Sequence, residues 1–218
     1  MIRVLLTSVL VIFLSGCVSA INIDQQTPKA NYVETEKVLI SIIDQRKKVK
    51  EGKDKTFIGV AHSTFGIPVD WHVKHLLATE KEDKNRNLGQ WLTHRIVAGL
   101  NNKGWQAEAV ELEPSATEAE IKNALNAAGA TTLIQLTLDE WYFSINLNWV
   151  SAFNFDTDTV VDIYHLTDGN VLSKRFKERD VIEESASESP QNNVLKAYRE
   201  QLQQIFNDVE VKRALTKS

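Results

Sequence analysis

The chain has 218 residues, of which 43% are hydrophobic and 25% are charged. With 9 Gly and 4 Pro, this composition is that of a globular protein, and it excludes collagen-like, low-complexity and wholly disordered chains. Lys and Arg number 25 against 29 Asp and Glu, so the net charge is −4 and gives no electrostatic reason to expect nucleic-acid binding.

The N-terminus has the three parts of a secretory signal: a positive charge at Arg3, an apolar run over residues 4–14, and small residues after it. The run is about half the roughly 20 residues that a membrane-spanning helix needs. It ends in the tetrapeptide LSGC, whose Cys17 is the single cysteine of the chain. This tetrapeptide resembles the lipobox of bacterial lipoproteins, in which the cysteine carries a diacylglycerol and an acyl chain such as palmitate. We therefore predict a lipoprotein signal peptide over residues 1–16 and lipidation at Cys17, with an ordinary secretory signal as the alternative.

The residue after the cysteine is Val18. In Gram-negative lipoproteins an Asp at this position retains the protein in the inner membrane, so the resemblance implies an outer-membrane anchor and a domain that faces the periplasm. Two or three acyl chains are enough to hold a domain stably at a membrane. Residues 17–36 are polar and follow no helical or strand period, which predicts a lipidated N-terminus and a flexible tether.

From residue 37 onward the hydrophobic pattern predicts a mixed order of strands and helices. We expect strands at 38–43 and 56–62, a loop over 63–86 with one short helix at 69–78, a helix at 88–103, a strand at 105–112, a helix at 118–128, strands at 130–143, 148–166 and 171–181, and a helix at 191–215. The dipeptide Asp168-Gly169 is a strong signal for a hairpin turn. Ser189 and Pro190 are suited to start the last helix.

This order of elements predicts a single α/β (α+β) domain over residues 37–218, with about three helices packed on one face of a mostly antiparallel mixed sheet. Eight apolar residues should then be buried in one core: Leu92, Ile96, Leu100, Leu125, Ile134, Leu136, Leu202 and Phe206.

Several short features together resemble the YajG-type family of bacterial outer-membrane lipoproteins. They are the lipobox, a strand that ends in Ile42-Ile43-Asp44-Gln45-Arg46, the pair Ile58-Gly59, the junction Lys103-Gly104-Trp105, long strands around 160–177 and a closing amphipathic helix. The resemblance implies a small periplasmic domain on a lipid anchor and transfers no catalytic residues. We expect Asp44 and Arg46 to pair structurally, because carboxylate–guanidinium pairs usually hold geometry.

Two histidines, His72 and His75, could share one face of a helix and hold a metal ion, with His62 and Asp70 near them in the sequence. Zinc needs three or four ligands, and the HxxH pattern lacks the glutamate of the HExxH motif. Lys74 between the two imidazoles would repel a cation. We therefore predict solvated histidines, no metal and no cofactor.

Two carboxylate pairs, Asp139-Glu140 and Asp156/Asp158, have the composition of a glycosidase site. On alternating strands, however, they are expected to be residues that face water. No nucleophile elbow and no glycine-rich phosphate loop occurs in the sequence, so we predict no enzymatic activity.

Aromatic residues crowd one pair of predicted strands: Trp141, Tyr142, Phe143, Trp149, Phe153 and Phe155. A large core is the favoured interpretation, and an exposed patch for a protein, glycan or lipid partner is the alternative.

The leading functional hypothesis is a non-enzymatic accessory module that binds another component of the cell envelope, most simply a protein. An envelope hydrolase with scattered catalytic residues is one alternative. A module that binds lipid or peptidoglycan fragments is another.

Overall fold

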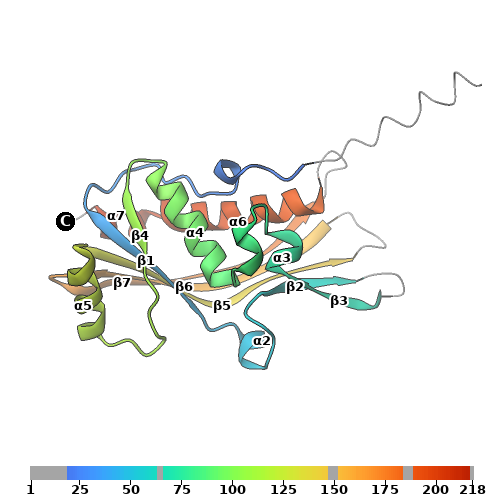
Figure 1. The fold of residues 1–218 in the computed structure, drawn as a ribbon, viewed down its shortest axis with the longest axis horizontal. Helices are drawn as coiled ribbons and strands as arrows, with labels where there is room; N and C mark the ends of the chain where they lie inside the picture. The colour runs from blue at the N-terminus through green and yellow to red at the C-terminus, as the bar shows by residue number, and fades with distance from the viewer. Residues whose placement is uncertain (1–18, 63–65, 147–151, 184–188, 217–218) are drawn as a thin grey trace, which may run out of the picture.

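The computed structural model describes residues 19–62, 66–146, 152–183 and 189–216 (Figure 1). Within them the chain forms a seven-stranded sheet. Its strands are β1 (Lys37–Asp44), β2 (Phe57–His62), β3 (Pro68–His72), β4 (Gln106–Ala109), β5 (Thr132–Asn146), β6 (Ala152–His165) and β7 (Gly169–Glu183). The helices are α2 (Lys47–Lys50), α3 (Val73–Leu76), α4 (Leu88–Asn101), α5 (Glu118–Ala128), α6 (Pro190–Asn207) and α7 (Val209–Leu215), with 3-10 turns at Ile23–Gln25 and Glu82–Asn85.

The long strand β5 organises the sheet. Along one edge it pairs antiparallel with β6, which in turn pairs antiparallel with β7. The other edge is shared, because β1 runs parallel to its first half and β2 runs parallel to its last residues. Strand β4 extends the sheet beside β1, and β3 extends it beside β2. The longest ladders are antiparallel, so the prediction of a mixed, mostly antiparallel sheet in a single domain is confirmed.

A β-bulge between Leu138 and Glu140 keeps the apolar residues of β5 on one face. Before the bulge the buried residues are Ile134, Leu136 and Leu138, and after it they are Trp141, Phe143 and Ile145. The extra residue shifts the alternation by one position, so that both halves of the strand face the same helices.

Most helices cover one face of this sheet. Helices α4 and α6 lie side by side above it, with α3 and α7 at their ends (Figure 1). The ring centroids of Trp91 in α4 and Tyr198 in α6 are 6.0 Å apart, which joins the two helices in one core. Seven of the eight predicted core residues belong to this cluster: Leu92, Ile96, Leu100, Ile134, Leu136, Leu202 and Phe206.

The eighth predicted core residue, Leu125, lies on the other face of the sheet, and this corrects the expectation that all helices share one face. Helix α5 packs there against Leu39 and Leu133. These two residues alternate with residues of the main core, and alternate side chains of a strand point to opposite faces. Helix α5 therefore covers a second, smaller core.

Two further expectations differ from the structure, and part of a third is not tested. The segment expected as a helix at 69–78 begins as strand β3, because it pairs with β2, and only Val73–Leu76 is helical. The helix expected at 191–215 is broken at Asp208, whose side chain accepts hydrogen bonds from the backbone of Glu210 and Val211 and so starts α7. The first residues of the strand expected at 148–166 lie outside the described residues.

The crowded aromatic residues are core. Trp141, Phe143, Phe153 and Phe155 are each at most 3% exposed, and Tyr142 is 8% exposed. Stacking of Phe155 on Tyr198 at a centroid distance of 4.9 Å ties the strand pair to α6. Trp149 lies outside the described residues. The core interpretation is confirmed for the other five.

Residues 19–36, which we call the strap, do not form the predicted tether. The strap crosses the outer surface of α4 and α6 (Figure 1), and Gln26, Thr27 and Ala30 in it are at most 5% exposed. Its hydrogen-bond partners lie up to 178 residues away, as in the bond from the Asn207 side chain to the carbonyl of Lys29. The strap is thus a packed third layer of the domain.

Gly99 makes room for the strap on α4, since a Cβ atom there would lie 2.4 Å from the carbonyl oxygen of Pro28. We expect Gly99→Ala to lower the free energy of unfolding by about 1–3 kcal/mol, the usual cost of overpacking, as measured by urea denaturation. Gly89→Ala in the same helix is the control, because its nearest contact would be an ordinary 3.4 Å. Equal stabilities of the two variants would contradict the role of Gly99.

Candidate functional site

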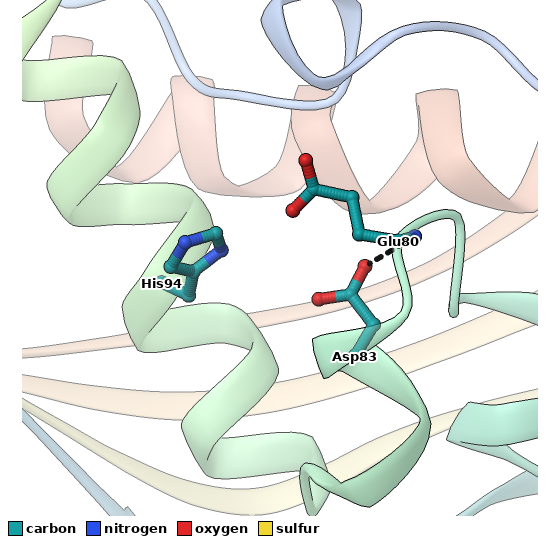
Figure 2. Close-up of side chains that lie close together, drawn as sticks. All are labelled: Glu80, Asp83 and His94. Atoms are coloured by element: carbon teal, nitrogen blue, oxygen red, sulfur yellow. Dashed lines mark hydrogen bonds between the residues drawn. The ribbon is translucent and has the colours of Figure 1, made fainter.

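One group of possible metal ligands occurs among the described residues: Glu80, Asp83 and His94, whose ligating atoms lie within 4.8 Å of one another. Figure 2 shows His94 on α4 facing the two carboxylates, which come from the connection between α3 and α4. The backbone N–H of Glu80 donates to Asp83 Oδ2 at 3.3 Å. No pattern in the sequence singled out these residues.

Two arginines already supply the positive charge of this cluster. Arg95 donates to both oxygens of Asp83, at 2.5 and 3.3 Å, and Arg86 pairs with the same carboxylate. Burial alone would raise the pKa of Asp83, but the hydrogen bonds and charges of Arg95 and Arg86 outweigh burial and lower it. Burial and the same arginines lower the pKa of His94. We interpret the cluster as a structural ion-pair network rather than a metal site.

The network holds the strap. Arg95 Nε donates to Gln26 Oε1 at 2.9 Å, and Gln26 Nε2 donates to the carbonyl of Ile21 at 2.7 Å and to the hydroxyl of Thr79 at 2.9 Å. Both Arg95 and Asp83 are fully buried. The sequence did carry a signal for Arg95, because it falls within the apolar stripe of α4, between Trp91 and Gly99, where a charge needs a partner.

The histidines considered as metal ligands lie elsewhere. His72 ends β3, and its Nδ1 lies 2.9 Å from the Thr56 hydroxyl. His75 is exposed, and its ring centroid is 5.6 Å from that of His72. Of the two other residues near them in the sequence, Asp70 pairs with Lys53, and His62 lines a groove on the opposite face of the sheet from α4 and α6. The structure does not gather these four residues into one site.

This groove lies between helix α2 and the strands. A hollow of about 520 Å³ is lined by Lys47, Lys48, Glu51, Val60, His62, Pro68, Glu140, Tyr142, Phe143, Ser144, Asp156 and Arg179. A second hollow of about 280 Å³ shares Lys47 and Glu140 with it, and adds Gln45, Lys50, Asp139, Asp158, Arg175 and Lys177. We call the two together the open-face groove. They bring the two predicted carboxylate pairs together in space.

Three carboxylates of the groove, Asp139, Asp156 and Asp158, are paired with cations of β7. Asp158, whose side chain is 6% exposed, accepts from Arg175 at 2.7 Å and from Lys177 at 3.0 Å. Arg175 also pairs with Asp139 at 2.9 Å, and Arg179 pairs with Asp156. The hydrogen bond to Asp158 raises the pKa of Lys177. A glycosidase needs two carboxyl groups that face the substrate, whereas Asp139, Asp156 and Asp158 are each held in an ion pair with a side chain of β7.

Tyr142 forms the wall of the groove next to α2. Its hydroxyl accepts a hydrogen bond from the backbone of Lys48 at 3.1 Å, and the Lys48 ammonium lies 5.2 Å from the ring centroid. Burial raises the pKa of Tyr142, so this side chain is a neutral phenol at physiological pH. The groove therefore offers charges of both signs around an aromatic wall.

The predicted pair of Asp44 and Arg46 lies behind this wall and is confirmed as structural. Arg46 is fully buried and binds both oxygens of Asp44, at 2.8 and 2.9 Å. It also donates to the carbonyl oxygens of Lys55, Phe57 and Trp141. This pair closes the loop that carries α2 and so fixes one side of the groove.

No protein-family model and no curated protein sequence matches the chain. Several solved structures are similar to this chain at low identity. Protein XCC0632 from Xanthomonas campestris, of family DUF330, is 13% identical, with 87% of this chain and 91% of that chain covered and a TM-score of 0.46. The LpoB C-terminal domain from Salmonella enterica is 11% identical, with 69% and 87% covered and a TM-score of 0.32. Lipoprotein GNA1162 from Neisseria meningitidis is 10% identical, with 79% and 99% covered and a TM-score of 0.36.

With TM-scores below 0.5, these likenesses carry no argument about what this chain binds. The helices of the described residues are each too short or too polar to span a bilayer.

Proposed function

We propose that this chain is a YajG-type lipoprotein, anchored through Cys17 to the outer membrane and facing the periplasm, that binds an envelope protein without catalysing a reaction. The observation that carries the binding role is the open-face groove. Its carboxylates and cations are arranged as ion pairs at the surface, and rows of exposed charges of both signs suit a polar protein partner. An anchored domain meets such partners within the envelope.

The size and lining of the groove support a partner segment rather than a small apolar ligand. Pockets for small molecules are mostly apolar with a few polar groups, whereas most residues of this lining are charged and come from α2, β5, β6 and β7. Arg175 and Lys177 are 52% and 67% exposed while they pair with Asp158. These side chains can exchange their partners when a polar surface docks.

Photo-crosslinking in cells tests the binding role. A photoreactive amino acid at Ser144, in the groove, should capture an envelope protein, and the same group at Val209, which is 68% exposed on α7, is the control. Combining the probe with Arg175→Glu and Lys177→Glu should reduce capture at least tenfold, since like charges then face Asp158. Capture that survives this reversal, or no capture at Ser144, would count against the groove. A captured glycan or lipid would favour the alternative of a module that binds lipid or peptidoglycan fragments.

The anchor has its own test. Cys17→Ala should abolish labelling by an alkyne fatty acid and block cleavage of the signal peptide, because the thiol is both the acylation site and the recognition residue of a lipobox. The readout is in-gel fluorescence together with the mass of the chain. A processed wild-type protein that carries no label would reject lipidation.

A further inference from the structure

The strap fixes the position of Ser19 on the folded domain. The side-chain amide of Asn192, in the first turn of α6, accepts from the backbone N–H of Ile21 at 2.9 Å and donates to the carbonyl of Ser19 at 3.1 Å. Asn192 is itself 6% exposed, and its backbone N–H donates a hydrogen bond to Oγ of Ser189, the N-cap of α6. The two hydrogen bonds of the Asn192 side chain hold Ser19, the first residue that the structure describes, at the start of α6.

Only two peptide steps separate Ser19 from Cys17. Two extended residues span at most about 7 Å, whereas a free tether over 18–36 would reach roughly 25 Å by the square-root law for flexible chains. The acyl chains on Cys17 would therefore lie next to the start of α6. The domain has too little free chain to rotate away from the lipid surface.

The same end of the domain carries exposed apolar side chains. The ladders place Val69 beside Ala61, Ala61 beside Ile145, Ile145 beside Phe153, and Phe153 beside Ile182. Val69, which belongs to this row, is 44% exposed. Two residues next to the row are also exposed, Ile67 at 58% and Val181 at 64%. Figure 1 shows that α6 begins at this end of the sheet, and the Gln191 side chain joins α6 there to the carbonyl of Leu76 in α3.

We propose that this end of the domain, defined by Ser19, Ile67, Val69 and Val181, rests on the lipid leaflet that holds the acyl chains of Cys17. This inference rests on the proposed lipidation. The partner surface is the boundary between headgroups and acyl chains, where apolar side chains are favoured. Strand β7 then ends at the membrane, and Val171 near its start lies about 33 Å from Val181, given ten residues at about 3.3 Å each.

Site-specific quenching tests the orientation on the lipidated full chain, reconstituted in vesicles of phosphatidylethanolamine and phosphatidylglycerol. Because acylation consumes the thiol of Cys17, Val181→Cys and Val171→Cys each introduce one reactive thiol. Both positions are exposed and both lie on β7, so they form a matched pair. A thiol-linked fluorophore should be quenched by headgroup-attached nitroxide at least threefold more strongly at position 181 than at position 171.

A second variant tests the short connection. Inserting twenty Gly and Ser residues between Val18 and Ser19 should bring the two quenching values close to one another, because the domain can then tumble. Equal quenching without the insertion, in protein that floats with the vesicles, would overturn the orientation and leave the anchor intact. Protein that fails to float and retains a free thiol at Cys17 would instead reject the proposed lipidation.

Discussion

Replacing Asp83 by Ala is expected to lower the free energy of unfolding by about 3–5 kcal/mol, the usual effect of removing one partner of a buried ion pair. The side chains of Asp83 and Arg95 are both fully buried, and Asp83 accepts from Arg95 and Arg86. Without the carboxylate, the guanidinium of Arg95 stays in the core beside Trp91, whose ring centroid lies 4.6 Å away. An uncompensated buried charge is costly.

Urea denaturation of the mature domain measures this effect. Asp24→Ala is the control, since Asp24 is exposed and its lysine partner is 4.0 Å away; its effect should stay within about 0.5 kcal/mol. Because Arg95 also binds Gln26, the Asp83 variant should in addition expose the strap to proteases. A loss below about 1 kcal/mol for Asp83→Ala, indistinguishable from that of an exposed pair, would mean that the network does not stabilise the domain.

The effect of Asp83 should also depend on pH. Its arginine partners lower the pKa of the native carboxyl, so the native state binds this proton less readily than the unfolded chain does. The stabilisation is present above the unfolded pKa of about 3.9 and is lost as the pH falls through the lower native pKa. The difference in stability between wild type and Asp83→Asn should therefore be constant near neutral pH and shrink below about pH 4.

Replacing Arg46 by Met should have a comparable effect, a loss of about 3–5 kcal/mol in the free energy of unfolding. The substitution retains an apolar chain of similar length but removes every donor of the guanidinium. Asp44, whose side chain is 7% exposed, would lose its cation. Three carbonyl oxygens would lose donors as well, those of Lys55, Phe57 and Trp141.

Lys48→Met is the matched control for Arg46. Both cations lie over the ring of Tyr142, at 5.2 Å for Lys48 and 5.3 Å for Arg46, but Lys48 is exposed. Its removal should change stability by less than about 0.5 kcal/mol. If both variants lost the same small amount, the buried contacts of Arg46 would not explain its position.

Local signals in the sequence determined much of the secondary structure. Helix α4 begins where Asn87 and Gln90 form a capping box, α5 begins at the equivalent pair Thr117 and Glu120, and α6 follows Ser189. Each signal depends on residues three positions apart, which one short stretch of sequence contains. The pairing of Asp44 with Arg46 was predictable for the same reason, because the two residues are neighbours along the chain.

Features that depend on distant residues could not be predicted from these signals. The strap follows no helical or strand period, since polar side chains hold it, such as Gln26, Asn192 and Asn207 from elements far apart in the sequence. Strand β3 forms because β2 offers it a free edge. The open-face groove lies between α2 and the strands and gathers charged residues of α2, β5, β6 and β7, which are far apart in the sequence.

What the sequence by itself determined is the alternation of strands and helices, the residues that must be buried and the resemblance of the N-terminus to a lipobox. Tertiary structure alone decided which face each helix covers. Leu39 and Leu133 are as apolar as Val38 and Ile134, so the pattern marks all four as buried without saying where their partners come from. Helix α5 is the crossover between β4 and β5, which both run parallel to β1, and the handedness of such a crossover, rather than the local pattern, decides which face the helix covers. The burial of Arg95 beside Asp83 likewise required packing, since only the folded chain brings the two charges together.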